Sequence, residues 1–366
     1  WGYLHLAHEN ADVMNQNHRY VVLGCKPGLK ERDLWTGEPQ PAFVCPVLCA
    51  TSQKLSDRFI LGYDDIHSVE YFGEPLDAFY KSVYGSFDAM FRKAVEDADD
   101  LYRETLAYDE KLMKDLEPFG AAYACVGALA YRQAVAAHKL VCKDGKMLFL
   151  SKECFSNGCM ATLDVTYPSV PLFLLYNPEL VRGMMRPIFD YAATKEWEGQ
   201  PYAPHDCGQY PLCNGQVYGV KDGKVLFDRQ MPVEECGNAI LVMAALDAAE
   251  PGNRGFLEEN KEVLAAWADY LAKNGYNPEN QLCTDDFAGY LARNCNLSLK
   301  AIVALGAYGK LFDAPEYTRL AEEFAGRWVN DAKVKGNPGS ELTFDYPGSW
   351  SLKYNMVWDK LLHLGL

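Results

Sequence analysis

The pattern of apolar and polar positions divides the chain near residue 75. Before that point, short β-prone runs at residues 19–24, 42–48 and 58–63 are separated by turns rich in proline, glycine and aspartate. After residues 71–75, apolar positions recur at the three- and four-residue spacing of helices that bury one face. The pattern therefore predicts β structure in residues 1–75 and a helical domain in residues 76–366.

The helical part divides into nine predicted helices, with proline or glycine at nearly every junction. They cover residues 87–116, 121–141, 169–176, 179–193, 233–249, 257–273, 297–312, 314–334 and 350–364. Consecutive helices without strands between them favour a mainly α fold, an α/α toroid of helical hairpins, over a doubly wound sheet. An open array of hairpins is the alternative, although no fixed repeat period is present.

The helix count and the ends of the chain predict that this toroid is incomplete. A closed (α/α)6 barrel consists of six hairpins, and an odd number of helices leaves the last one without a partner. The chain starts at Trp1 without an initiator methionine, and residues 361–366 are still apolar. We therefore expect a fragment that lacks N- and C-terminal segments of the same protein, so that any signal peptide would not be visible.

Composition and charge restrict the class of protein. The chain is 49% hydrophobic and 13% aromatic, which is enough for a large core and excludes disorder for most of its length. A net charge of −15 disfavours nucleic acid and anionic membranes as partners. The longest apolar runs, 170–176 and 239–246, are far shorter than a membrane span. These features predict a soluble protein whose partner is a small-molecule substrate.

The twelve cysteines give no sign of a disulfide framework or a metal site. No CxxC motif occurs, and the closest spacings match no zinc or cluster pattern. A site made of His205, Cys207 and Cys213 is disfavoured because its spacing is wrong and a fourth ligand is missing. We predict free thiols, no metal and no cofactor, and a cytoplasmic location, with a secreted or periplasmic one as the alternative.

The candidate chemistry lies in loops at successive hairpin junctions, which converge on one rim in a toroid. Seven acidic residues of these loops are the candidate catalytic residues. They are Glu153, Asp164, Asp206, Glu234, Glu235, Asp285 and Asp286. Paired carboxylates suit hydrolysis, because one can donate a proton while the other acts on water or attacks directly. Acids at helix starts also stabilise the helix dipole or cap the helix, and this structural role remains open for Glu234, Glu235, Asp285 and Asp286.

Other polar and aromatic side chains in the same loops are candidates for substrate binding. They are His205, Asn157, Tyr210, Arg293, Asn294, Trp350, Lys353, Tyr354 and Asn355. Among the acids, Asp206, Glu235 and Asp285 rank highest because each neighbours another polar residue where a rim loop begins. If the acids form an active site, at least three of the seven must line a common cavity.

The same loops carry a family resemblance. The segments at residues 151–158, 164–169, 204–211, 230–235, 283–289 and 353–360 resemble the glutaminase A family. The resemblance covers the whole chain and implies a β-sandwich followed by an (α/α)6 domain of the six-hairpin glycosidase type. It also implies hydrolysis of L-glutamine to L-glutamate and ammonia, although many bacterial relatives are known only as domains of unknown function.

The activity leaves alternatives. No serine is followed three residues later by lysine, so amide hydrolysis here needs another device, such as a carboxylate that activates water. A glycoside hydrolase acting on an unknown glycan through paired carboxylates is the second hypothesis, and a noncatalytic ligand-binding relative is the third. A compact pocket with one cation for a carboxylate favours glutaminase, an open groove lined with aromatics favours the glycosidase, and diverging acids favour the third.

Overall fold

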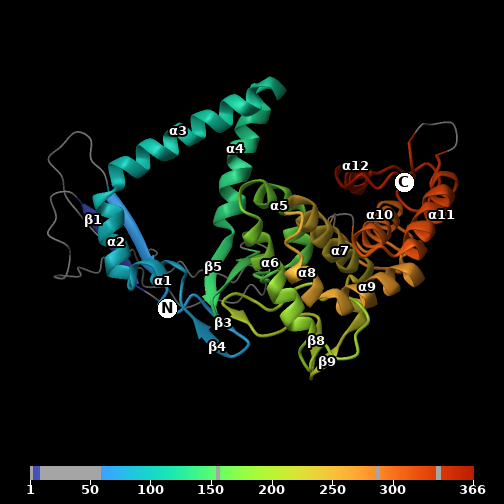
Figure 1. Cartoon of the computed structure of the whole chain (residues 1–366), viewed down its shortest axis with the longest axis horizontal. Helices are drawn as coiled ribbons and strands as arrows, with labels where there is room; N and C mark the ends of the chain where they lie inside the picture. The colour runs from blue at the N-terminus through green and yellow to red at the C-terminus, as the bar shows by residue number, and fades with distance from the viewer. Residues whose placement is uncertain (1–2, 9–58, 154–156, 285–288, 335–338) are drawn as a thin grey trace, which may run out of the picture. The chain divides into compact units, whose positions relative to one another are not determined.

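The computed structural model describes residues 3–8, 59–153, 157–284, 289–334 and 339–366, and within them the chain is mainly helical with several short strands (Figure 1). The chain forms two compact units. One consists of Trp1–Ile66 and Val83–Ala107, and the other of His67–Ser82 and Tyr108–Leu366. The predicted domain boundary at residue 75 stays a prediction.

The first unit contains two antiparallel strands and a helix. Strands β1 (Tyr3–His8) and β2 (Phe59–Asp64) pair, and helix α2 (Phe87–Glu96) packs against β2. Gly62 allows this approach, since a Cβ there would lie 2.7 Å from the ring of Phe91. β2 confirms the strand predicted at 58–63, whereas the runs at 19–24 and 42–48 lie outside the described residues.

The helix predicted at 87–116 is broken in the structure. α2 ends at its C-cap Asp97, and α3 (Ala98–Leu116) follows directly. The short elements α1 (Tyr80–Tyr84) and the 3₁₀ turn η1 (Glu117–Phe119) flank this region.

Two β-hairpins interrupt the part that was predicted to be helical throughout. α4 (Ala121–Ala136) ends before residue 141, and the chain continues as β5 (His138–Lys143) and β6 (Lys146–Ser151). The turn between these strands is Asp144-Gly145, with φ of 50° and 74°, the conformation that tight hairpins require. Asp222-Gly223 joins β8 (Val220–Lys221) to β9 (Lys224–Val225) in the same way. The prediction of uninterrupted helices was wrong here because these two turn signals were missed.

A small sheet completes the strands of the second unit. Its order is β4-β3-β7, formed by β3 (Val69–Tyr71), β4 (Glu74–Leu76) and β7 (Leu212–Cys213). β7 runs parallel to β3 over two residue pairs. The sheet thereby connects residues near the predicted boundary with the loop that follows residue 205.

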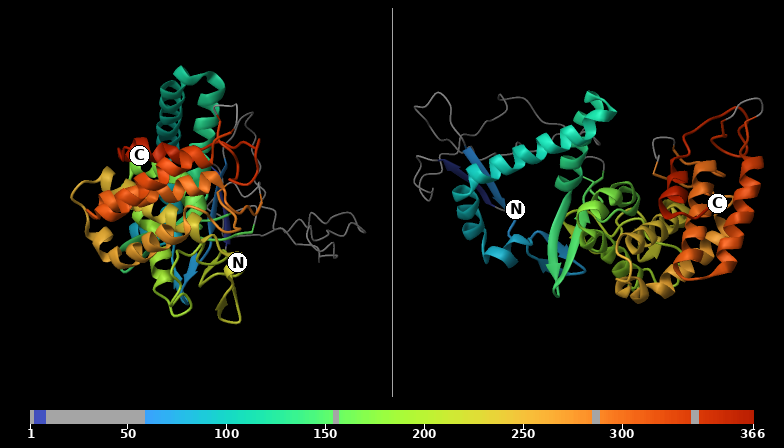
Figure 2. Two further views of the ribbon diagram at one scale, coloured as in Figure 1. Left: turned by 90° about the vertical axis from the view of Figure 1, so that its right-hand side faces the viewer. Right: turned by 45° about the horizontal axis from the view of Figure 1, so that its top comes forward.

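Three helical hairpins form the main body of the second unit, in two layers (Figures 1 and 2). The hairpins are α5 (Leu163–Tyr176) with α6 (Pro178–Ala192), α7 (Pro232–Ala249) with α9 (Lys261–Asn274), and α10 (Cys295–Leu311) with α11 (Pro315–Asp331). α7 lies in contact with both α5 and α10, and these three helices form the inner layer, while α6, α9 and α11 pack against them. The shorter elements are α8 (Gly255–Glu259), α12 (Val357–Leu362) and the 3₁₀ turns η2 (Phe227–Arg229) and η4 (Tyr354–Met356).

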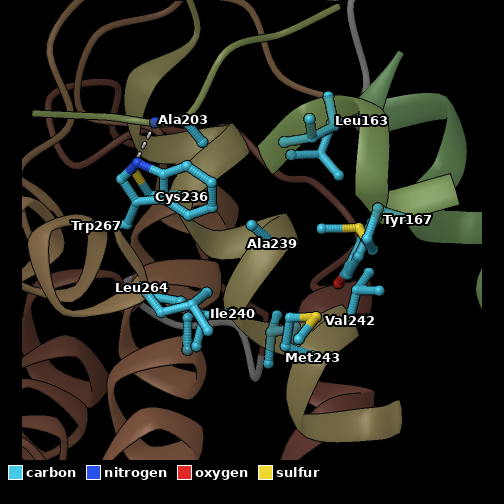
Figure 3. Packing of buried hydrophobic residues seen from close by; sticks show 14 of the residues in the cluster. Leu163, Tyr167, Ala203, Cys236, Ala239, Ile240, Val242, Met243, Leu264 and Trp267 are labelled. Atoms are coloured by element: carbon cyan, nitrogen blue, oxygen red, sulfur yellow. Dashed lines mark hydrogen bonds between the residues drawn. The ribbon is translucent and has the colours of Figure 1, made fainter. Parts of the chain in front are cut away.

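The burial of the inner helices follows from their composition. α7 is buried continuously from Pro232 to Leu246, and α10 from Cys295 to Gly309. Both helices are apolar around most of their circumference, which is typical of a helix covered on all sides. Figure 3 shows this core, in which Tyr167 of α5 and Trp267 of α9 lie on opposite sides of α7. No helix of the described residues is long and apolar enough to cross a bilayer.

α5 begins earlier than predicted, and this places a candidate residue. The predicted helix started at residue 169, directly after Pro168, whereas a proline normally disfavours a helix interior. In the structure the helix starts at Leu163 and contains both prolines of this segment, because Leu163, Tyr167 and Val170 are buried on one face. Tertiary packing outweighs the lost hydrogen bonds, and Asp164 therefore lies in the first turn of α5.

The described cysteines are free thiols. They are Cys125, Cys142, Cys159, Cys207, Cys213, Cys236, Cys283 and Cys295, and the last six are buried. Cys236 of α7 accepts a hydrogen bond from the backbone N–H of Ala203 at 3.4 Å (Figure 3). The remaining four cysteines lie outside the described residues, and the cellular compartment stays a prediction.

His138 of β5 should make the stability of the second unit pH-dependent. Its ring stacks on Phe149 at 4.3 Å, its Nδ1 hydrogen-bonds to the carbonyl of Ala134, and burial lowers its pKa to about 4. Since the unfolded pKa is about 6.5, the neutral ring supports full stability above that pH, and stability is lost as the pH falls towards 4. The linked loss is about 2–3 kcal/mol.

This prediction can be checked by urea denaturation between pH 7 and pH 4.5. As the pH falls, the urea midpoint of the His138→Phe variant should decrease less steeply than that of the wild type, because phenylalanine has no proton to gain. Equal slopes in the two proteins would contradict the role of His138.

Candidate active site

A cavity of about 500 Å³ lies in the second unit, beside the N-terminal ends of the inner helices α5 and α7. Its lining residues come from segments that are far apart in sequence. They are Glu153, Asn157, Cys159, Asp164, Val165, Pro168, His205, Asp206, Gln216, Tyr218, Gly219, Arg229, Met231, Leu282, Thr284 and Tyr290. The cavity therefore brings together several of the loops that the sequence pattern had marked as carrying chemistry.

His205 is held between two carboxylates on the cavity wall. Its Nε2 lies 3.5 Å from Asp164 Oδ1, and its Nδ1 shares a 2.8 Å hydrogen bond with Asp206 Oδ2. The backbone fixes this arrangement, because the N–H of Leu163 at the start of α5 donates to the carbonyl of His205 at 2.8 Å. Asp164, His205 and Asp206 thus form a continuous charged row that reaches the cavity.

A glycine orients the last member of this row. Asp206 Oδ1 accepts a hydrogen bond of 3.0 Å from the backbone N–H of Gly208. Gly208 has φ of +145°, and a Cβ there would lie 2.2 Å from the carbonyl oxygen of Leu212. The turn after Asp206 therefore requires glycine, and it fixes the carboxylate that in turn orients His205.

Within this row, His205 and Asp164 form an ion pair. Burial alone would lower the pKa of His205, but the carboxylates of Asp164 and Asp206 outweigh it and raise that pKa well above its usual value. Burial alone would raise the pKa of Asp164, but the charge and hydrogen bond of His205, with a smaller contribution from Lys300, lower it. Asp164 is thus a carboxylate beside an imidazolium.

Glu235 lies behind this pair, fully buried in the first turn of α7. Its Oε2 accepts a 3.0 Å hydrogen bond from Asn238 Nδ2, while its Oε1 has no hydrogen-bond partner. Burial and, next, the charge of Asp164 raise the pKa of Glu235 well above its usual value. One atom each of Asp164, His205 and Glu235 lies within 4.8 Å of the others, so this trio could hold a metal ion.

Glu234, the neighbouring acid, forms a buried ion pair with Lys300 of α10. The Lys300 Nζ donates to Glu234 Oε1 and to Asn238 Oδ1, the latter at 2.7 Å, and lies 4.1 Å from the centre of the Tyr167 ring. Both charged side chains are almost completely inaccessible. Thr284 of the cavity wall also donates its backbone N–H to Glu234 Oε1 at 3.1 Å, so the pair joins α5, α7, α10 and the wall.

The structure brings together some of the predicted acids and separates others. Glu153, Asp164 and Asp206 line the cavity, which meets the predicted minimum of three, and the Glu153 Oε1 accepts a 2.9 Å hydrogen bond from Thr162. Glu234 and Glu235 lie behind the wall. Asp285 and Asp286 fall outside the described residues. The catalytic roles of these acids stay predictions.

Among the predicted substrate-binding residues, His205 and Asn157 line the cavity. The other seven are absent from its described lining, and for most of them the structure shows another role. Asn294 caps α10, and Arg293 pairs with Asp345 at 3.1 Å. Lys353 donates to the carbonyl of Ser351 at 2.8 Å.

The remaining four also lie outside the described lining of the cavity. Asn355 accepts a 2.8 Å hydrogen bond from the Tyr167 hydroxyl, and Tyr210 lies under Lys152 Nζ at 5.5 Å. Trp350 is exposed, and Tyr354 lies half-buried in η4. The polar loops converge only in part, because several of these side chains serve to fix helix ends and turns.

Sequence reasoning missed Lys300 as a site residue, together with Arg229, Tyr218, Thr284 and Tyr290 of the cavity wall. A signal existed for Lys300, since a single charge in an otherwise apolar helix needs a buried partner. No comparable signal marks Arg229, which follows a short hairpin in an exposed segment.

Comparison with known proteins agrees with the fold. A family model described as the glutaminase A six helical-hairpin domain matches residues 120–366, and a model of a domain of unknown function matches residues 1–115. Glutaminase A of Aspergillus oryzae is 30% identical over 324 residues, covering 84% of this chain and 46% of that protein. A probable glutaminase of Arthroderma benhamiae is 29% identical over 320 residues, covering 70% of this chain and 36% of that protein.

The chain thus spans less than half the length of these two relatives. The matched domain confirms the predicted class of helical hairpins, and the relatives confirm the resemblance of the loop segments.

Proposed function

We propose, because this chain belongs to the glutaminase A family, that its cavity hydrolyses the side-chain amide of L-glutamine to L-glutamate and ammonia. The observation that carries the proposal is the row formed by Asp164, His205 and Asp206 on the wall of one cavity. A carboxylate beside an imidazolium can position and activate a water molecule next to an amide carbonyl. The relatives that are named glutaminases support the same reaction.

The cavity suits a small amino acid. Its volume of about 500 Å³ lies within the range of small-molecule sites. Arg229 is the one permanently cationic side chain among the described residues of its lining. A guanidinium binds a carboxylate in a bidentate way, so Arg229 is suited to the α-carboxylate of glutamine. Glu153, a further acid of the lining, can supply negative charge for the α-ammonium group.

Water is a better nucleophile here than the protein's own thiol. Cys159 lines the cavity, but burial and the nearby Asp206 raise its pKa to about 12, which keeps the thiol protonated near neutral pH. In the proposed reaction, the water oxygen forms a bond to the amide carbon and the C–N bond breaks. The nitrogen leaves as ammonia, carrying the proton that the water loses.

A glycoside hydrolase is the second candidate. Oxygen atoms of Asp164 and Glu235 come within 4.8 Å of each other, nearer to the ~5–5.5 Å of retaining enzymes than to the ~6.5–9.5 Å of inverting ones. Tyr218 and Tyr290 could stack on a sugar ring. Glu235, however, is fully buried and is not part of the described lining, so it has no direct access to a glycosidic bond. The geometry therefore favours the amide substrate.

The deciding experiment measures ammonia and glutamate release from L-glutamine, with L-asparagine and a panel of glycosides assayed in parallel. We expect equal amounts of ammonia and glutamate from glutamine and no free sugar. Release of sugar without ammonia would support the glycosidase instead, and no turnover of either class would refute both catalytic proposals.

Arg229→Gln should raise the KM for glutamine by about 10–100-fold, the equivalent of one charge-assisted hydrogen bond, with a smaller change in kcat. Steady-state kinetics check this, with Lys224→Gln as a matched control, because Lys224 is exposed on the neighbouring strand β9. An unchanged KM in Arg229→Gln would mean that the α-carboxylate is bound elsewhere.

A further inference from the structure

We propose that Asp164, His205 and Glu235 bind one divalent transition-metal cation, Zn²⁺ or Mn²⁺, at the wall of the cavity. Its catalytic role rests on the proposed hydrolase function, whereas the binding itself does not. The residues come from three separate elements: the first turn of α5, the loop before β7, and the first turn of α7. Their meeting therefore results from the fold and not from sequence proximity.

The distances fit a site that closes slightly on binding. Two ligands of a tetrahedral metal with bonds of 2.0–2.1 Å lie about 3.3 Å apart. His205 Nε2 and Asp164 Oδ1 are separated by 3.5 Å, close to that value. The widest separation within the trio is at most 4.8 Å, so a small side-chain rotation brings the third ligand into range.

The second nitrogen of His205 is held as in metal sites. A histidine that binds a metal usually directs its other ring nitrogen to a carboxylate or carbonyl, which fixes the ring and its tautomer. His205 Nδ1 makes this contact with Asp206 Oδ2 at 2.8 Å, and Gly208 fixes Asp206 in turn. The Nε2 thereby faces Asp164, and it can bind a cation when the ring gives up its proton to the solvent.

Glu235 supplies an independent observation. It is 0% exposed, and its Oε1 has no hydrogen-bond partner. A buried carboxylate oxygen without a partner is costly, and a cation would compensate it. The buried ammonium of Lys300 does not serve this purpose, because its hydrogen bonds go to Glu234, Asn238 and Thr284.

The ligand set indicates the kind of metal. Imidazole favours transition metals such as zinc, and carboxylates also suit manganese, whereas calcium prefers oxygen ligands alone. Three protein ligands leave a coordination position for water, as in catalytic zinc sites. Because Asp164 and His205 line the cavity, that position can face the substrate amide, where the cation would lower the pKa of the bound water and polarise the carbonyl.

The test uses tag-free protein treated with EDTA and dialysed, to which Zn²⁺, Mn²⁺ or Ca²⁺ is added alone. We expect one Zn²⁺ or Mn²⁺ per chain by elemental analysis, and a rise in Tm of several degrees that grows with metal concentration. Ca²⁺ should give a much smaller rise. Glu235→Gln and Asp164→Asn should abolish the shift, Asp206→Asn should weaken binding about 10–100-fold, and Asp269→Asn, on the outer helix α9, should leave it unchanged.

The outcomes separate the two proposals. The metal site is refuted if no metal binds, or if Glu235→Gln and Asp164→Asn bind and stabilise as the wild type does. Full glutamine hydrolysis by metal-free protein would refute a catalytic role of the cation, while leaving the binding site and the hydrolase proposal intact. Stoichiometric binding lost in both variants supports the site, even if glutamine is not hydrolysed, in which case only the proposed function fails.

Discussion

Replacing Asp164 by asparagine should lower kcat for glutamine hydrolysis by about 10²–10⁴-fold, the range for loss of a group that activates the attacking water. Asparagine keeps the size of the side chain but removes the charge that faces His205 Nε2 at 3.5 Å and the cavity. Whether Asp164 acts on water directly or through a bound cation, the carboxylate is required. The effect should therefore appear in kcat and not only in KM.

The measurement is ammonia release at saturating glutamine, with the folded state checked by circular dichroism. Asp269→Asn is the matched control, because Asp269 accepts a 2.6 Å hydrogen bond from Tyr317 on the outer helices and lies outside the described cavity lining. Its kcat should equal that of the wild type. If Asp164→Asn retains more than about a tenth of wild-type kcat, Asp164 does not activate water.

Replacing Lys300 by methionine should lower the free energy of unfolding of the second unit by about 3–5 kcal/mol, because it leaves Glu234 as an uncompensated buried charge. The ammonium joins Glu234 and Asn238 of α7 to Thr284 of the cavity wall, and it lies over the ring of Tyr167 in α5. Methionine fills similar volume, so the loss would come from charge and hydrogen bonding and not from a cavity.

A double variant separates these contributions. Lys300→Met combined with Glu234→Gln removes both charges, and it should be more stable than Lys300→Met alone, since a neutral amide is cheaper to bury than an unpaired carboxylate. Denaturation can be followed by tryptophan fluorescence, because the buried Trp267 and Trp328 report on unfolding of the second unit. A loss below about 1 kcal/mol in Lys300→Met would place this pair among those that contribute little to stability.

The helical architecture was largely predictable, because the number and spacing of apolar residues in a helix depend on how much of its surface is buried. The inner helices α7 and α10 are apolar around most of their circumference, and outer helices such as α6 and α11 have one apolar stripe. The β-hairpin β5–β6 was also present in the sequence, as alternating residues around Asp144-Gly145, but it was missed. In α5, by contrast, packing kept two prolines inside a helix, which local propensity alone would not predict.

The candidate site was likewise predictable only in part. The sequence alone determined which residue types were available, the hairpin fold class, and the loops that carry acids such as Asp164 and Asp206. Only the tertiary structure decided that Asp164, His205 and Glu235 meet, that Lys300 is paired with Glu234, and that Asn294 and Asn355 serve packing and capping. The physical reason is that helix patterns depend on neighbours a few residues apart, whereas these side chains meet across long stretches of sequence, where distance is set by how the inner helices pack.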